Sequence, residues 1–352
     1  MSESIRPHFQ LPFRVSGIPQ VSPAVALERC VSSATAEALV SRLRCDGTEG
    51  ARCPCCGSMG GQAYLKAPDR FHGRARLYQL LRCPSCSLVW LENPPPPSDM
   101  ARHYGEDYDR AVARAGSDPR QWVARRATLL RYKSAGRILD LGCSSGGFLE
   151  CLSGMSWELC GIEMSERVAK QARTFTGAEV FVGDILDAPF PPASFDAITC
   201  FHVFEHLYEP GEVLAKVYEW LKPGGIFYTE MPNIDSAGAR IFGSYWFPLE
   251  LPRHLYHFSP ASLRNLAGSA RLHEVSITTH REVFIGSSVR YILDGIFTKL
   301  GINRTPLAQS KSPTLPWRVA RKGFRLTVLP ILEYTAGLAG EGEIINAVFK
   351  KV

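Results

Sequence analysis

The sequence predicts an α/β fold, a doubly wound parallel sheet, because short apolar strands alternate with helical segments over its second half. The strands are expected at residues 137–140, 158–163, 179–182, 195–201 and 226–230, with a final strand at 343–349. Helices are expected between them, at residues 165–175 and 211–220. Parallel strands of this kind are buried on both faces, and ligands bind at their carboxyl ends.

The bulk composition is that of an ordinary globular enzyme. The chain has 352 residues, enough for two domains or one domain with appendages, and its net charge of +6 is too mild to require a nucleic-acid partner. No segment approaches the roughly 20 apolar residues of a membrane-spanning helix. The first residues lack the pattern of a secretory signal, so we expect a cytoplasmic protein.

A glycine-rich turn, Asp140 to Gly147, follows the first of these strands. Its backbone can approach a nucleotide-like cofactor closely, and we expect Gly142, Cys143 and Gly146 to contact that cofactor. A dinucleotide fingerprint would have glycine at the position of Ser144. A carboxylate at Asp140 repels phosphate but attracts an ammonium or sulfonium group. The turn therefore favours S-adenosylmethionine as cofactor.

Two further carboxylates follow the next strands. Glu163 ends the second strand, where an acid can accept hydrogen bonds from both ribose hydroxyls. Asp184 ends the third strand and is expected to hold the adenine amino group, with Ile185 covering the ring. Met164 and Phe201 complete the predicted cofactor contacts.

Two Cys-x-x-Cys pairs precede this region. Their members are Cys53, Cys56, Cys83 and Cys86. Four thiolates on two turns are the tetrahedral set that a structural zinc ion prefers, and such a closed site leaves no position for catalysis. Cys55 could compete as a ligand. Disulfides are the alternative, disfavoured by the odd total of eleven cysteines, and unligated thiols are a further one.

Five ordered motifs resemble those of class I S-adenosylmethionine-dependent methyltransferases. They are Asp140–Gly146, Glu163, Asp184, residues 195–198 and residues 221–225. The resemblance covers about residues 136–281 and implies a Rossmann-like sheet of seven strands whose last strand runs antiparallel.

A narrower resemblance covers most of the chain. The cysteine pairs, the prolines at 94–97 and the Pro252-Arg253-His254 sequence resemble bacterial methyltransferases with an amino-terminal zinc-binding domain. That group includes sugar-nucleotide C-methyltransferases and enzymes of polysaccharide gene clusters. The resemblance implies a sugar nucleotide or a glycan-linked hydroxyl or carbon as acceptor. The chain departs from the group at Arg253, where the relatives often have glutamate.

Four histidines are candidates for the base that removes a proton from the acceptor. His202 and His206 follow the fourth strand, and His254 and His257 lie in a long insertion after the fifth. His254 or His257 is the preferred base, because such an insertion can cover the acceptor pocket. Packing beneath aromatic side chains is the alternative for both.

The predicted organisation has four parts. They are an amino-terminal segment with one possible helix (1–50), a zinc ribbon (51–92), a proline linker with a helical lead-in (93–134) and the methyltransferase domain (135–352), which contains a basic helical insertion (285–340).

Three alternatives stay open from the sequence. Arginines between Arg110 and Arg137 could follow the phosphates of RNA, as in an rRNA guanine methyltransferase with a zinc ribbon. The chain could also be a non-catalytic adaptor that retains the fold. Finally, the basic segment at 285–340 could lie on an anionic membrane surface or simply pack on the sheet.

Overall fold

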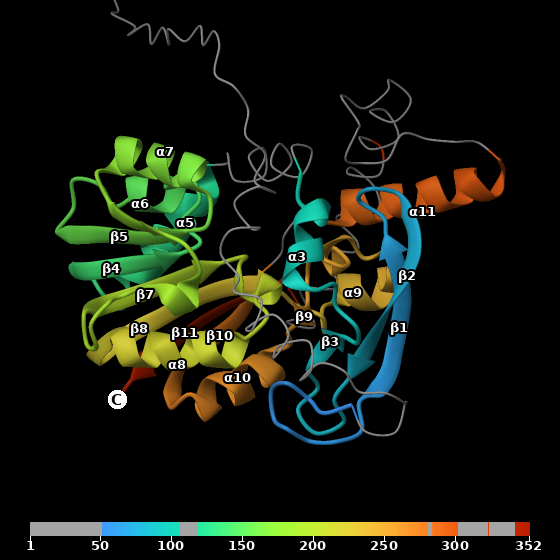
Figure 1. The fold of residues 1–352 in the computed structure, drawn as a ribbon, viewed down its shortest axis with the longest axis horizontal. Helices are drawn as coiled ribbons and strands as arrows, with labels where there is room; N and C mark the ends of the chain where they lie inside the picture. Colours follow the sequence, from blue (N-terminus) through green and yellow to red (C-terminus); the bar gives the residue numbers. More distant parts are fainter. Residues whose placement is uncertain (1–50, 106–118, 281–283, 302–322, 324–341) are drawn as a thin grey trace, which may run out of the picture.

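The computed structural model describes residues 51–105, 119–280, 284–301, 323 and 342–352. They form a seven-stranded sheet and a four-stranded sheet that lie side by side (Figure 1). The helix expected within residues 1–50, the arginines at 110 and 114, and most of the basic segment at 285–340 lie outside the described residues.

The seven-stranded sheet has the order β10-β11-β8-β7-β4-β5-β6. Its strands are β4 (Gly136–Leu141), β5 (Trp157–Glu163), β6 (Glu179–Val182), β7 (Phe195–Phe201), β8 (Leu221–Pro232), β10 (Leu272–His280) and β11 (Ile344–Lys351). Strands β4 to β8 pair in parallel, whereas β11 runs antiparallel to both β8 and β10. The predicted α/β class and the antiparallel last strand are therefore confirmed.

Helices cover both faces of this sheet (Figure 1). One face carries α5 (Pro119–Leu130), α6 (Gly147–Glu150) and α7 (Glu166–Thr176), and the other carries α8 (Pro210–Trp220) and α10 (Pro260–Ser269). Helix α10 begins with a capping box between Ser259 and Ser262 and has Pro260 in its first turn, as the sequence indicates. Helix α6 has only four residues, so the glycine turn leads into a single helical turn.

The small sheet has the order β1-β2-β3-β9. Its first three strands are β1 (Gln62–Asp69), β2 (Arg74–Arg82) and β3 (Val89–Leu91). The fourth, β9 (Tyr256–His257), comes from the insertion after β8 and pairs antiparallel with β3. The sequence did not predict this strand. Between the sheets, α3 (Pro97–Met100) starts at the last of the four prolines and is followed by the 3₁₀ turn η1 (Ala101–His103).

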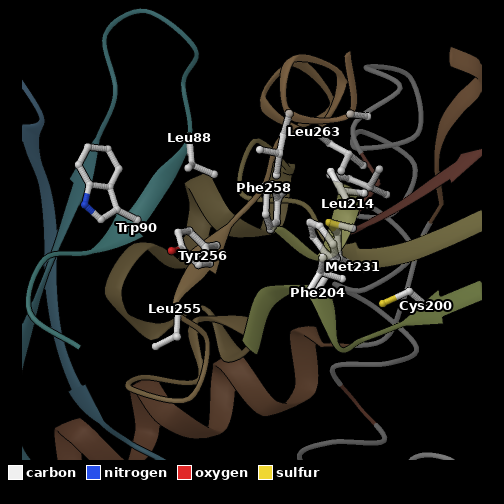
Figure 2. Close-up of a cluster of buried hydrophobic side chains, with 14 of the residues drawn as sticks. Leu88, Trp90, Cys200, Phe204, Leu214, Met231, Leu255, Tyr256, Phe258 and Leu263 are labelled. Carbon is white, nitrogen blue, oxygen red and sulfur yellow. The ribbon is translucent and has the colours of Figure 1, made fainter. Parts of the chain in front are cut away.

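One apolar cluster runs through both sheets (Figure 2). Tyr256 and Phe258 lie at the middle of this cluster. On one side of them are Leu88 and Trp90 of the small sheet, and on the other side is a group of side chains from the core of the large sheet. That group is Cys200, Phe204, Leu214, Met231 and Leu263. Because these buried residues share contacts, the small sheet and the large sheet bury apolar surface against each other.

The insertion between β8 and α10 folds over the carboxyl ends of the strands. It contains α9 (Ala237–Phe242) and the 3₁₀ turns η4 (Gly243–Tyr245) and η5 (Phe247–Leu249). Helix α11 (Ile285–Lys299) packs on it, because Ser288 Oγ accepts a hydrogen bond of 3.0 Å from the Phe247 amide and Tyr291 stacks near the Phe247 ring. Among the described helices, none is both long and apolar enough to cross a bilayer.

Replacing Phe258 by alanine tests the shared cluster. Phe258 is fully buried, so its loss should lower the free energy of unfolding by about 3–5 kcal/mol. The control is Phe175→Ala on α7, where 65% of the side chain is exposed and a change within about 0.5 kcal/mol is expected. Urea unfolding of the full chain provides the measurement. An equal effect of both substitutions would contradict the role of the cluster.

Candidate functional site

The glycine turn connects β4 to α6 at the carboxyl edge of the sheet. Gly142, Ser144 and Gly146 have φ values of 70°, 49° and 87°, all in the left-handed region. A Cβ on Gly142 would come within 2.5 Å of Val203, so this position excludes larger residues. The Cys143 amide donates to the Ile162 carbonyl at 2.9 Å and holds the turn against β5. The turn is therefore rigid and open at its backbone.

Asp140 lies at the end of β4 with only 4% of its surface exposed. One of its oxygens accepts a hydrogen bond of 2.7 Å from Thr199 Oγ1. Burial, with a smaller contribution from nearby Glu163, raises the pKa of Asp140 to about 7 against the lowering effects of Thr199 and Arg125. A bound cation would favour the ionised form of this carboxyl group.

The other predicted cofactor residues lie along the same edge. Glu163 accepts hydrogen bonds from the amides of Ser144 at 3.1 Å and Ser165 at 2.9 Å, which ties the turn to the end of β5. Asp184 caps the 3₁₀ turn η2 (Ile185–Asp187) by accepting from the Leu186 amide at 2.9 Å. Ile185 is buried beneath that turn, whereas Met164 is 43% exposed beside Glu163.

Phe201 ends β7 and packs edge to face against Phe148 and Tyr228, with ring centroids 4.9 Å apart in each case. The guanidinium of Arg125 lies 4.5 Å from the Phe201 ring centroid and forms a buried ion pair of 2.7 Å with Glu230. Sequence reasoning missed this pair because Arg125 stands in a run of arginines that resembles a solvated helix surface.

Two of the predicted histidines are in contact. The rings of His206 and His254 have centroids 4.5 Å apart and are nearly perpendicular. His254 Nδ1 donates to the Pro248 carbonyl at 2.8 Å, and His206 Nδ1 lies 3.2 Å from the Arg253 carbonyl and 3.0 Å from the Tyr104 hydroxyl. A ring nitrogen facing a carbonyl carries the hydrogen, so each Nε2 retains its lone pair.

The other two histidines take different places. His202 follows β7 in the left-handed region, with φ of 55°, and its Nδ1 lies 3.5 Å from a Glu205 oxygen. His257 lies on β9, 2% exposed, with Nε2 donating to the Leu249 carbonyl at 3.1 Å and its ring 6.2 Å from that of His254. Burial lowers the pKa of His257 to about 4. In His257 the carbonyl partner thus engages Nε2, whereas in His254 it engages Nδ1.

Glu205 is a site residue that sequence reasoning missed. It lies in η3 (Phe204–His206), is 1% exposed, and neither of its oxygens accepts a hydrogen bond from the described residues. Burial alone would raise the pKa of Glu205, but His202 and His206 outweigh it and lower the pKa. Potential ligand atoms of Glu205, His206 and His254 lie within 4.8 Å of one another. We call His202, Glu205, His206 and His254 the histidine cluster.

The four predicted cysteine ligands converge. Cys53 Sγ lies 3.5 Å from Cys86 Sγ, Cys56 Sγ lies 3.6 Å from Cys83 Sγ, and all four sulfurs lie within 4.8 Å of one another. Zinc–sulfur bonds of about 2.3 Å in a tetrahedron separate the sulfurs by roughly 3.8 Å, so this arrangement fits the ion. Cys55 instead directs its Sγ toward the Ser262 carbonyl on α10 at 3.8 Å.

Comparisons with known proteins agree with this architecture. Residues 102–272 match a family model described as a methyltransferase domain. A ubiquinone biosynthesis O-methyltransferase of Thiobacillus denitrificans is 31% identical over 170 residues, which cover 45% of this chain and 72% of the relative. A probable S-adenosylmethionine-dependent methyltransferase of Mycolicibacterium smegmatis is 26% identical over 32% of this chain and 46% of the relative.

Among solved structures, a methyltransferase of Thermotoga maritima described as a possible histamine N-methyltransferase aligns with a TM-score of 0.46 and 18% identity. The alignment covers 70% of this chain and 96% of that structure.

The raised pKa of Asp140 predicts that cofactor affinity depends on pH. Below its pKa of about 7 the carboxyl group is protonated, and binding a cation must then release the proton. Affinity for S-adenosylmethionine should therefore fall between about pH 7.5 and about pH 6, by up to roughly tenfold per pH unit. Titration calorimetry measures it. The slope should be lost in Asp140→Asn; if it persists there, another group is responsible.

Proposed function

Because the chain belongs to the class I S-adenosylmethionine-dependent methyltransferases, we propose that it methylates a small acceptor, a sugar nucleotide or a glycan-linked hydroxyl or acidic carbon. The observation that carries this proposal is the histidine cluster at the end of β7, beneath the insertion that follows β8. Imidazole lone pairs at that place suit an acceptor that must lose a proton.

The cofactor, when bound, supplies a methyl group on a positively charged sulfur. In our proposal Asp140 attracts its positive charge, Glu163 accepts from the ribose hydroxyls and Asp184 holds the adenine amino group. Gly142, Cys143 and Gly146 admit the cofactor close to the backbone.

The proton of the acceptor goes to His254 Nε2 in this proposal. Nδ1 of that ring is held by the Pro248 carbonyl, which fixes both tautomer and orientation. His254 would hold the proton that the acceptor loses when it takes the methyl group from the bound cofactor. His206 orients the ring from one side, and His257 supports it from β9.

Oxygen is the acceptor atom that we favour. The relative from Thiobacillus denitrificans is named as an O-methyltransferase, and a hydroxyl gains most from a neighbouring base. Arg253, which stands where zinc-domain relatives often have glutamate, is fully buried and does not present a cation to an acceptor. A screen of S-adenosylhomocysteine release with sugar nucleotides and phenols, followed by mass spectrometry of the product, tests the acceptor class.

We also propose that Cys53, Cys56, Cys83 and Cys86 hold a structural zinc ion. The spacing of the four sulfurs supports the ion, and the two knuckles share one geometry, since Gly57 N donates to Cys53 O and Ser87 N to Cys83 O. Neither Cys-x-x-Cys turn lies on the cofactor edge, so the role of the metal is to hold the small sheet together.

The described arginines speak against the RNA alternative. Arg125 pairs with buried Glu230, Arg126 donates to the Cys151 carbonyl, and Arg137 pairs with Glu158 and Glu179. For the membrane alternative, the packing of α11 on η5 supports an internal role for residues 285–299. A non-catalytic adaptor would bind the cofactor yet release no S-adenosylhomocysteine with any acceptor.

Replacing His254 by glutamine should lower kcat about 10²–10⁴-fold, because the acceptor loses the group that takes its proton. The affinity for S-adenosylmethionine should be unchanged, since the ring lies on the acceptor side. His273→Gln, on the outer strand β10 where the residue is exposed, is the matched control. Unchanged kcat in His254→Gln would remove this residue from the reaction.

Metal analysis of purified protein should find about one zinc ion per chain. Cys83→Ser should lose the ion and lower the midpoint of thermal unfolding, because a structural zinc ion needs four protein ligands and only three thiolates remain. Cys55→Ser is the control and should retain zinc, since the Cys55 sulfur is not one of the four that lie within 4.8 Å of one another and is directed toward the Ser262 carbonyl. Zinc loss in Cys55→Ser alone would assign the ligands differently.

A further inference from the structure

We propose that Glu250 is a positioning residue for His254. Arg253 holds the Glu250 carboxylate in place, and Asp69, on the small sheet, holds Arg253. This inference rests on the proposed function, because it assigns a partner to the base of that same site. Nothing in the sequence pattern singles out Glu250 or Asp69, which lie 181 positions apart, Glu250 just after η5 in the insertion and Asp69 at the end of β1.

The backbone at Glu250 is the first observation. Its φ is 36° and its ψ is 41°, a left-handed conformation that is unfavourable for a residue with a side chain. In this conformation the Glu250 carbonyl accepts from the amides of Arg253 at 2.8 Å and His254 at 3.2 Å. The chain thus turns back on itself, and Glu250 comes to lie beside the ring that follows it by four positions.

The side-chain distances are the second observation. Glu250 Oε2 lies 3.9 Å from His254 Nε2 and 3.4 Å from Arg253 Nε. The Glu250 side chain is 16% exposed, and those of Arg253 and His254 are 0% and 7% exposed. The Glu250 carboxylate therefore faces Nε2 of His254 from a largely buried position.

Asp69 provides the anchor on the small sheet. It ends β1, is fully buried, and has one oxygen 3.7 Å from Arg253 Nη1. Its other oxygen lies 2.9 Å from His72 Nδ1 and 3.4 Å from His103 Nδ1. Arg253 Nη1 also donates to the His103 carbonyl at 3.4 Å. A buried guanidinium needs such partners, because a charge left alone in the interior is costly.

Other charged and titratable groups surround His254. They are Glu250 and Arg253 on its own loop, Glu205 and His206 on η3, His257 on β9, Tyr104 after η1, Asp69 and His72 at the end of β1, His103 on η1 and Tyr291 on α11. Burial raises the pKa of Tyr104 and of Tyr291, and the charge of Glu250 adds to both effects. Burial lowers the pKa of His206, and Glu250 opposes that effect. The charge of the Glu250 carboxylate thus influences the pKa of each of these three side chains.

The role of Glu250 follows from its charge. When His254 takes a proton at Nε2, the imidazolium gains a carboxylate 3.9 Å away, which opposes the lowering of its pKa by burial, by His206 and His257, and by the charge of Arg253. Glu250 therefore raises the basicity of His254, and Arg253 prevents the carboxylate from turning away. The small sheet therefore contributes to the proposed acceptor site through Asp69, although none of its residues takes part in the reaction.

Glu250→Gln is the principal test, because it removes the charge and keeps the volume. We expect kcat to fall about tenfold, and the acidic limb of the kcat/KM profile to move to lower pH by roughly one unit. A residue with only a structural role would lower activity without moving that limb. Glu250→Asp retains the charge and should keep the limb near its original position. Glu274→Gln, whose carboxylate pairs with Arg264 on the surface, is the matched control.

Asp69→Asn tests the anchor. It should raise the KM for the acceptor and move the acidic limb in the same direction as Glu250→Gln, with zinc content and affinity for S-adenosylmethionine unchanged. The matched control is Asp235→Asn, which removes another ion pair between the sheets, with Arg82 at 3.0 Å. Equal effects of both substitutions on the limb would overturn the assignment of Asp69.

The protonation of His254 can be measured without methyl transfer, so that the role of Glu250 is tested separately from the proposed function. Imidazole ¹⁵N signals of His254 in the full chain report protonation at Nε2, and in Glu250→Gln this ring should take its proton at lower pH than in the original protein. Absence of methyl transfer to every acceptor would sink the proposed function alone. Identical titration and identical pH limbs in folded Glu250→Gln would sink the inference alone.

Discussion

The pairing of β3 with β9 joins the two sheets and sets the place of the insertion that carries His254. Two residue pairs, Val89 with His257 and Trp90 with Tyr256, align the strands, and the Leu91 amide adds a bond of 2.9 Å to the Leu255 carbonyl. Because His254 directly precedes Leu255, this short ladder decides where its ring lies. The cluster around Tyr256 and Phe258 then covers the ladder with apolar side chains (Figure 2).

Buried carboxylates lie in two places at the carboxyl edge of the large sheet. One is the proposed cofactor side at the glycine turn, and the other is the proposed acceptor side at the histidine cluster. Thr199 and Arg125 do not outweigh the burial of Asp140, on the cofactor side, and the pKa of its carboxyl group rises to about 7. Glu205 and Asp69, on the acceptor side, have imidazole and guanidinium partners that lower the pKa of each carboxyl group despite burial. One side can thus respond to an arriving cation, while the other keeps fixed negative charge next to histidines.

Local patterns predicted most of the fold. Residues 195–201 form a strand as expected, and the strand expected at 226–230 extends to 221–232. The shortness of α6 and the existence of β9 were not foreseen, because a four-residue helix and a two-residue strand leave no periodicity to detect. The convergence of Cys53, Cys56, Cys83 and Cys86 was predictable because the spacing within each Cys-x-x-Cys turn brings its two sulfurs to one side before any tertiary contact forms.

The sequence by itself determined the α/β class, the carboxylates of the cofactor edge and the four converging cysteines, since each follows from neighbours a few positions apart. Only the tertiary structure places His254 against His206 and Glu250 and so decides which charges stand beside each histidine. Asp69 lies on β1, Glu205 on η3, and Glu250 and Arg253 on the loop after η5, so that only the packing of the insertion against the small sheet brings them near one another. The physical reason is that burial and charge neighbours, which set the basicity of a histidine, arise from contacts distant in sequence.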